Sequence, residues 1–226
     1  MSGRTPAAVA QALDHAVLRP ECTAADLAAQ ARMCVARGVG CLCVRSCDVA
    51  EAARLVAGSP VVVASVIGFP HGSQRPEVKA LEARLAIADG GRELDMVLNI
   101  GRLRSGDLAA VRDDIAAVVA EAKPRGVPVK VILETCLLGP AEIVAACRAA
   151  EEAGADFVKT STGFGGGGAT PEAVRLMLDT VGGRLGVKAS GGIRTWDDAV
   201  RYLDMGCRRI GVGDAARILD GAAGAG

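Results

Sequence analysis

The chain has 226 residues, half of them hydrophobic, and its 26 basic and 26 acidic residues give a formal net charge of zero. This length suffices for one domain with a substantial core. The neutral balance and an aromatic content of 2% argue against binding to nucleic acid or to a membrane surface. Because the sequence shows neither a long apolar run nor a signal peptide, we expect a cytoplasmic protein whose eight cysteines are free thiols.

Short runs rich in β-branched residues alternate with alanine-rich stretches along the chain. The runs predict strands near residues 13–18, 39–44, 61–67, 93–99, 128–134, 156–160, 185–189 and 208–212. The stretches between them predict helices, and Thr23, Thr170 and Thr195 provide helix-start signals. The expected helix ends carry glycines at positions 38, 90, 126, 154 and 206.

Eight strand–helix units without a break predict an α/β fold, a (β/α)8 TIM barrel that forms a single domain over residues 1–226. The alternative is a doubly wound open sheet. It is weakened because no Gly-x-Gly-x-x-Gly turn follows the first strand. We expect the Gly/Ala-rich tail at 221–226 to be frayed.

Charged residues interrupt strands that a barrel should fill with apolar side chains. These residues are Glu93, Asp95, Lys130, Glu134, Lys159 and Lys188. Alternation places Asn99 on the same strand face as Glu93 and Asp95, and Glu134 on the same face as Lys130. We interpret Lys130 and Glu134 as members of structural ion pairs inside the barrel.

Lys159 and Lys188 stand apart because they end two successive predicted strands, where the active sites of barrels form. A lysine that is desolvated beside another cation has a lowered pKa, and its neutral amine can attack a carbonyl carbon. Each lysine is followed by a hydroxyl residue and glycines, a composition suited to holding a phosphate. The pattern indicates a Schiff-base enzyme that acts on a phosphorylated carbonyl compound.

Glycine clusters at 163–168, 191–192 and 211–213 follow the last three predicted strands. Barrel enzymes often bind phosphate with these final loops, so the clusters favour a phosphate site there. The cysteines at 41, 43 and 47 lack a partner motif for zinc, and we expect no bound metal. We interpret the two histidines, His15 and His71, as structural.

The chain resembles the deoxyribose-phosphate aldolase family of class I, or Schiff-base, aldolases. The matching segments run in order along nearly the whole chain: DH at 14–15, GFPHG at 68–72, EVKALEAR at 77–84, ELDMVLNIG at 93–101, KVILET at 130–135, FVKTSTGF at 157–164 and VKASGGIR at 187–194. The resemblance implies a (β/α)8 barrel that reversibly cleaves 2-deoxy-D-ribose 5-phosphate to D-glyceraldehyde 3-phosphate and acetaldehyde. It implies neither a metal nor an organic cofactor.

The resemblance also implies roles for individual residues. Lys159 matches the Schiff-base lysine, and Lys188 matches the second lysine, which lowers the proton affinity of the first. Asp95 matches the aspartate that shuttles protons through a water. The positions expected near the substrate phosphate are Gly163, Ser190, Gly191, Gly192 and Gly213.

Three segments depart from the family pattern. Ala16 stands where a threonine is usual, and Arg45-Ser46-Cys47 replace a segment that usually has an aromatic residue or Asn and a Pro. Gly213 and Asp214 replace a serine pair, so a carboxylate stands where a hydroxyl would help to bind phosphate. Asp214 either faces the site or caps the last helix. Some relatives end in a tyrosine that reaches the site, but here Tyr202 on a predicted helix is the only tyrosine.

Three other functions stay open at this point. Asp214 suggests a Schiff-base aldolase that favours non-phosphorylated aldehydes. A phosphosugar isomerase would use Lys159 as an electrostatic group instead of a nucleophile. A binding or regulatory protein would keep the barrel without turnover, although the Lys159, Lys188 and Asp95 set argues against it. The expected partners are a phosphosugar and acetaldehyde, with no nucleic acid and no membrane, and a homodimer is left open.

Overall fold

A computed structural model describes residues 3–224 of the chain. Eight parallel strands form one closed barrel in sequence order, with each strand paired to the next and β8 paired to β1. The strands are β1 (Leu13–Val17), β2 (Cys41–Val44), β3 (Val62–Ile67), β4 (Glu93–Val97), β5 (Val129–Ile132), β6 (Phe157–Lys159), β7 (Gly186–Ser190) and β8 (Arg209–Val212). The predicted (β/α)8 barrel is therefore confirmed.

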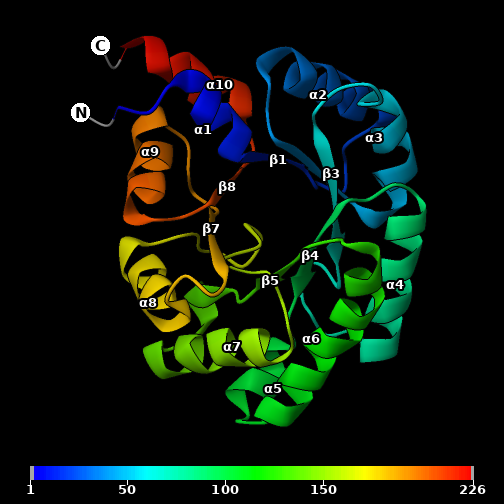
Figure 1. Ribbon diagram of the computed structural model, residues 1–226, viewed down its shortest axis with the longest axis vertical. Helices are drawn as coiled ribbons and strands as arrows, with labels where there is room; N and C mark the ends of the chain where they lie inside the picture. The colour runs from blue at the N-terminus through cyan, green and yellow to red at the C-terminus, as the bar shows by residue number, and fades with distance from the viewer. Residues whose placement is uncertain (1–2, 225–226) are drawn as a thin grey trace.

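The helices form a ring around the strands, and α1 and α10 lie side by side near the two chain ends (Figure 1). They are α1 (Pro6–Ala12), α2 (Ala24–Arg37), α3 (Val49–Leu55), α4 (Pro76–Ala88), α5 (Ile100–Arg104), α6 (Leu108–Ala122), α7 (Pro140–Glu152), α8 (Pro171–Val181), α9 (Trp196–Met205) and α10 (Ala215–Asp220). Short 3-10 turns lie at η1 (Ser46–Asp48), η2 (Lys123–Arg125), η3 (Thr135–Leu137) and η4 (Gly221–Gly224). Within the described residues, no helix is long and apolar enough to span a membrane.

The helix starts follow the predicted signals. The Thr23 side chain accepts a hydrogen bond from the Asp26 backbone N–H, and Asp26 returns a bond to the Thr23 backbone, which makes a complete capping box. Thr170 and Thr195 cap α8 and α9 in the same way with their side chains. The chain had no predicted helix before the first strand, yet Thr5 caps α1, which begins with Pro6.

Several strands are shorter than predicted, and in β4 and β5 this corrects the placement of a side chain. β4 ends at Val97, so Asn99 does not share the inward face of Asp95 and instead caps α5 by accepting a hydrogen bond from Arg102. β5 ends at Ile132, and Glu134 lies beyond it in the left-handed backbone region, with a φ of 59°. The period-two alternation fails there because it holds only while the backbone stays extended.

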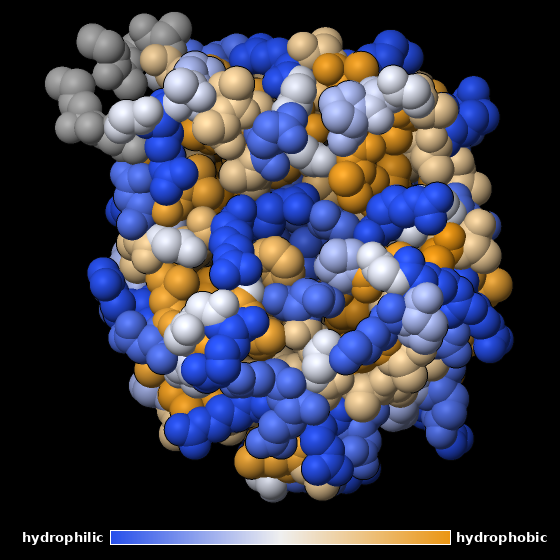
Figure 2. Space-filling view, in the orientation of Figure 1, coloured by the Kyte–Doolittle hydropathy of each residue, from blue (hydrophilic) through white to orange (hydrophobic). Residues whose placement is uncertain are grey.

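The apolar core lies mainly between the barrel and its ring of helices. Figure 2 shows hydrophilic side chains around the middle of the face, over the strands of Figure 1. On β2 the alternation is clear, because Leu42 and Val44 join the outer core while Cys41 and Cys43 lie in a second apolar cluster. Of the tail that we expected to be frayed, residues 221–224 form η4 and residues 225–226 lie outside the described part.

Candidate active site

Asp95 is the centre of a buried charge cluster inside the barrel. Its two carboxylate oxygens accept hydrogen bonds from the Nζ atoms of Lys130, Lys159 and Lys188, each at 2.7 Å. The lysines come from β5, β6 and β7, and each side chain is at most 3% exposed. The structure therefore brings together the three predicted catalytic residues and adds Lys130, whose predicted role as a structural ion-pair residue is confirmed.

A second layer of charges supports this centre. Asp14 on β1 accepts a short hydrogen bond from Lys188 and another from Arg209 Nε at 2.7 Å. Arg209, at the start of β8, also donates to Glu93 at 2.9 Å, and Lys130 lies 2.5 Å from Glu93. Sequence reasoning did not single out Arg209 and gave Asp14 no role. A charge at the start of a buried strand was the available signal for Arg209.

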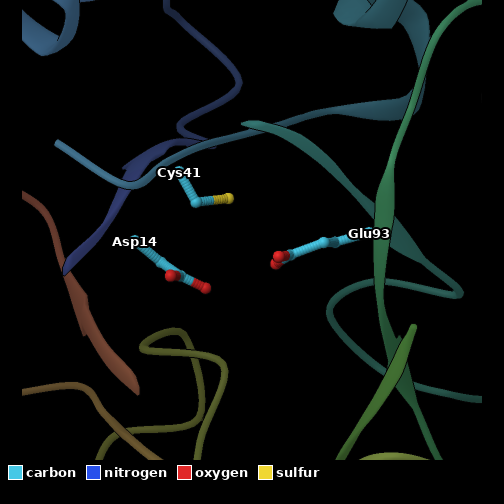
Figure 3. Close-up of side chains that lie close together, drawn as sticks. All are labelled: Asp14, Cys41 and Glu93. Carbon is cyan, nitrogen blue, oxygen red and sulfur yellow. The ribbon is translucent and has the colours of Figure 1, made fainter. Parts of the chain in front are cut away.

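Asp14, Cys41 and Glu93 point toward one another from β1, β2 and β4 (Figure 3). Their ligand atoms lie within 4.8 Å of one another, which is close enough to suggest a metal site. However, both carboxylates already have cationic partners, because Lys130 and Arg209 each form ion pairs with Asp14 and with Glu93. A metal ion would have to displace these cations, so the cluster is explained by the ion-pair network.

The two predicted catalytic lysines have opposite pKa shifts. Burial lowers the pKa of Lys159, and the charge of Lys188 lowers it further against the opposing effect of Asp95. Burial also disfavours the charge of Lys188, but Asp14 and Asp95 outweigh burial and raise its pKa. Lys188 therefore remains an ammonium, while Lys159 is the member of the pair that loses its proton more readily.

The interior holds four cationic side chains, Lys130, Lys159, Lys188 and Arg209, against the three carboxylates of Asp14, Glu93 and Asp95. A neutral Lys159 balances these charges. Although burial raises the pKa of Asp95, the lysines around it outweigh burial and lower its pKa well below the ordinary range. Asp95 is thus an ionised hydrogen-bond acceptor over the whole physiological pH range.

A cavity of about 790 Å³ opens above β1, β6, β7 and β8. All five positions predicted near the substrate phosphate line it: Gly163, Ser190, Gly191, Gly192 and Gly213. Lys159 and Lys188 are buried below it and are not among its lining residues, although Ser190 lies two residues after Lys188 on β7. Three arginines also line the cavity: Arg19, Arg194 and Arg217. Sequence reasoning gave these guanidinium groups no role, although such groups match phosphate oxygens well.

Arg45 and Asp214, which depart from the family pattern, both make specific contacts in the structure. Arg45 forms an ion pair with Asp48 and donates hydrogen bonds to the backbone carbonyls of Arg19, Pro20 and Cys22, so it fastens a loop that lines the cavity. Asp214 accepts a hydrogen bond from the Arg217 backbone N–H and caps α10, and it lines the same cavity. Asp214 therefore combines the two alternatives that the sequence left open, because it caps the last helix and also faces the cavity.

The structure confirms the prediction for His15 but not the prediction for Glu134. His15 is buried, and its Nδ1 accepts a hydrogen bond from the Ala215 backbone N–H, which confirms a structural role. Burial lowers the His15 pKa. The prediction of an ion pair for Glu134 is wrong, because its carboxylate accepts hydrogen bonds from the backbone and side chain of Thr162. The cause is the end of β5 at Ile132, which turns Glu134 away from the barrel interior.

A closed (β/α)8 barrel with three buried lysines around one carboxylate, beneath a cavity lined by glycines, is the architecture of an aldolase, which is a lyase. Residues 8–212 match the family model described as DeoC/LacD family aldolase, and the chain belongs to this family.

Several relatives of known name cover nearly all of the chain. The deoxyribose-phosphate aldolase of Mycobacterium avium is 51% identical over 222 residues, which cover 96% of this chain and 98% of that one. The deoxyribose-phosphate aldolase of Thermococcus gammatolerans is 48% identical over 216 residues, with coverages of 95% and 96%. The solved tetrameric structure of the Aeropyrum pernix deoxyribose phosphate aldolase has a TM-score of 0.91 at 33% identity, and the match covers 97% of this chain and 92% of that one.

Proposed function

We propose that this aldolase reversibly cleaves 2-deoxy-D-ribose 5-phosphate to D-glyceraldehyde 3-phosphate and acetaldehyde through a Schiff base on Lys159. The observation that carries the proposal is that Lys159 and Lys188 are both bound to Asp95, while only the pKa of Lys159 is lowered. A neutral amine beside a permanent cation is the arrangement that nucleophilic attack on a carbonyl needs. The names of the relatives support the choice of substrate.

The reaction begins when the Lys159 amine attacks C1 of the open-chain sugar, and the C1 oxygen leaves as water with one proton from the amine and one from solvent, which the final hydrolysis returns. The resulting iminium draws the electron pair of the C2–C3 bond toward its nitrogen. Asp95, through a water, accepts the proton of the C3 hydroxyl, which becomes the aldehyde of glyceraldehyde 3-phosphate. Because Asp95 is a weak base, it holds this proton only until C2 of the enamine takes it. Hydrolysis then releases acetaldehyde and restores the free amine.

The cavity supplies the proposed phosphate site. Backbone N–H groups of the glycine-rich loops at Gly163 and at Gly191–Gly192 are suited to bind phosphate oxygens, since glycine permits the close approach of backbone to ligand. The guanidinium groups of Arg194 and Arg217 add positive charge to the same cavity. This site would hold the far end of the sugar while C1 reaches Lys159.

The decisive experiment is chemical trapping. Acetaldehyde and borohydride should leave a reduced ethyl adduct on the peptide that contains Lys159, detected by mass spectrometry. Lys159→Ala should lose both the adduct and turnover, whereas the exposed control Lys123→Ala should keep both. An adduct confined to Lys188, or the absence of any adduct, would contradict the proposal and favour a phosphosugar isomerase.

The proposal also includes a cytoplasmic location, which the eight free cysteines support because reducing compartments keep thiols unpaired. It further includes a homodimer. Val78, Leu81 and Leu85 form an exposed apolar stripe on α4, which contact with a second copy would bury. Light scattering coupled to size exclusion measures the mass in solution, and a monomer would contradict this part.

A further inference from the structure

Glu134 is a buried carboxylate with an unusual backbone. Its side chain follows β5, the residue is 2% exposed, and its φ of 59° is the only positive value for a non-glycine residue within 3–224. A residue with a Cβ rarely adopts this region and does so only where its surroundings hold it there. The conformation therefore indicates that contacts with neighbouring residues hold Glu134 in place.

Its carboxylate holds the start of the loop between β6 and α8. The backbone N–H of Thr162 lies 3.3 and 3.4 Å from the two oxygens of Glu134, and the Thr162 hydroxyl donates a short hydrogen bond to one of them. Because this hydroxyl donates its proton to Glu134, its oxygen is free to accept, and the Phe164 backbone N–H donates to it at 2.9 Å. Two hydrogen bonds in series thus connect Glu134 to Phe164.

The loop is also shaped against the carboxylate. A Cβ added to Gly165 would lie only 2.7 Å from Cδ of Glu134, so the backbone passes too close for any side chain there. Beyond the hydrogen bonds, the Phe164 ring meets the Phe69 ring edge to face, with centroids 5.2 Å apart. Glu134 and Phe69 therefore fix the loop from two sides.

The loop held in this way forms one wall of the cavity. Thr162, Gly163 and Phe164 all line it, together with the segments 190–194 and 211–214. Glu134 itself does not line the cavity, and the proposed chemistry at Lys159 does not use it. Any effect of Glu134 on the bound sugar must therefore pass through the loop that it contacts, by its hydrogen bonds to Thr162 and its packing against Gly165.

We propose that Glu134 is a positioning residue that sets the geometry of the phosphate-binding loop through Thr162. This proposal rests on the proposed function, because it assigns the phosphate end of the sugar to Gly163 and its neighbours. Glu134 then controls the affinity for phosphorylated substrate without controlling attack by Lys159. Glu134 changes substrate affinity through the hydrogen bonds that its carboxylate accepts from Thr162, and not through an electrostatic effect of its negative charge on the lysines.

Four variants separate positioning from general stability. Glu134→Gln keeps the size but loses one of the two acceptor oxygens, and Glu134→Gly removes the carboxylate while relieving the backbone, since glycine adopts positive φ readily. Thr162→Val removes the hydroxyl, and Thr162→Ser is the matched control that keeps a hydroxyl at this position. For each variant, KM and kcat are measured with 2-deoxyribose 5-phosphate and with free 2-deoxyribose, together with Tm and the rate of acetaldehyde trapping on Lys159.

We expect KM for the phosphorylated sugar to rise about tenfold in Glu134→Gln, Glu134→Gly and Thr162→Val, which is a loss of about 1.4 kcal/mol. KM for free 2-deoxyribose and the trapping rate should stay within about twofold of wild type, and Thr162→Ser should recover the wild-type KM. Combining Glu134→Gln with Thr162→Val should add little to either change alone, because the two residues act in series.

Equal changes in KM for both sugars, unchanged KM in folded Glu134→Gly, or additive effects in the double variant would each overturn the proposal. These outcomes are distinct from failure of the proposed function, which would appear as the absence of a Lys159 adduct in the wild-type enzyme.

Discussion

Lys159 and Lys188 donate hydrogen bonds to the same oxygen atom, Oδ2 of Asp95, and each bond is 2.7 Å long. The two lysines are direct partners across the β6–β7 pair, so the strand register places them side by side where both can reach Asp95. Lys188 also binds Asp14, whereas Asp95 is the hydrogen-bond partner of Lys159 in the described part of the chain. Lys188 thus has two carboxylate partners and Lys159 has one, which explains why the pKa of Lys188 is raised while the pKa of Lys159 is lowered.

Removing the charge of Lys188 should move the pH–rate profile. Lys188 lowers the Lys159 pKa in the folded enzyme, so Lys188→Met should raise that pKa and leave less neutral amine at a given pH. We expect the rise of kcat/KM to shift to higher pH, together with a lower rate at pH 7. Lys188→Arg is the matched control because it keeps the cation, and its profile should stay near that of wild type. A slow Lys188→Met enzyme with an unmoved profile would assign Lys188 another role.

Asp95→Asn should separate adduct formation from bond cleavage. Asp95 opposes the lowering of the Lys159 pKa, so its removal should leave more neutral amine and preserve borohydride trapping with acetaldehyde. Cleavage needs a proton acceptor, and we expect kcat to fall by a factor on the order of 100 to 10,000. Trapping and steady-state cleavage are measured on the same preparation. Cleavage at the wild-type rate would place the proton transfer elsewhere.

Asp14 should contribute to stability in a pH-dependent way. Although burial raises its pKa, Lys188, Lys130 and Arg209 outweigh burial and lower it from 3.8 to about 2. The stabilisation is therefore present above the unfolded-state pKa and is lost as the pH falls from 3.8 to about 2.

At pH 7, Asp14→Asn should reduce the free energy of unfolding by about 2 kcal/mol, as measured by urea denaturation. The difference from wild type should shrink below about pH 4. The exposed Asp113→Asn, which also loses an ion pair, should change stability by less than about 1 kcal/mol. A loss for Asp14→Asn that is the same at pH 7 and pH 3 would exclude the electrostatic explanation.

Asp214→Ser should strengthen the preference for phosphorylated sugar. Serine can still accept the hydrogen bond that caps α10, so the helix start is kept while the negative charge leaves the cavity. A carboxylate about 5 Å from a phosphate charge costs roughly 3 kcal/mol at an effective dielectric near 20, before screening by salt. We expect KM for 2-deoxyribose 5-phosphate to fall while KM for free 2-deoxyribose, the internal control, stays constant. Unchanged KM values for both sugars would limit Asp214 to helix capping.

Most of the fold could be predicted because its signals are local. β-branched runs, threonine caps and glycine stops each depend on a few neighbouring residues, as Thr23 and Gly38 illustrate. Lys159 and Lys188 could be found for the same reason, since each interrupts an apolar strand and precedes glycines. The register of β6 and β7 then makes them neighbours.

The parts that escaped prediction depend on distant contacts. Arg209 meets Asp14 only because β8 closes the barrel against β1, which joins opposite ends of the chain. Glu134 was misplaced because a single left-handed residue ends the alternation, and no local signal marks a non-glycine residue for that conformation. Arg45 fastens the loop of Arg19 and Pro20 through backbone carbonyls, which carry no side-chain signal in the sequence.

The count of four cations to three carboxylates inside the barrel also bears on which covalent species is favoured. In the proposed reaction, the nitrogen of Lys159 is neutral as the free amine, positive as the iminium and neutral again as the enamine. Because the other three cations balance the three carboxylates, the iminium gives the buried cluster a net charge of +1, which raises its free energy relative to both neutral states. Electron flow from the breaking C2–C3 bond removes this net buried charge, so the balanced set of charges inside the barrel favours cleavage of the iminium.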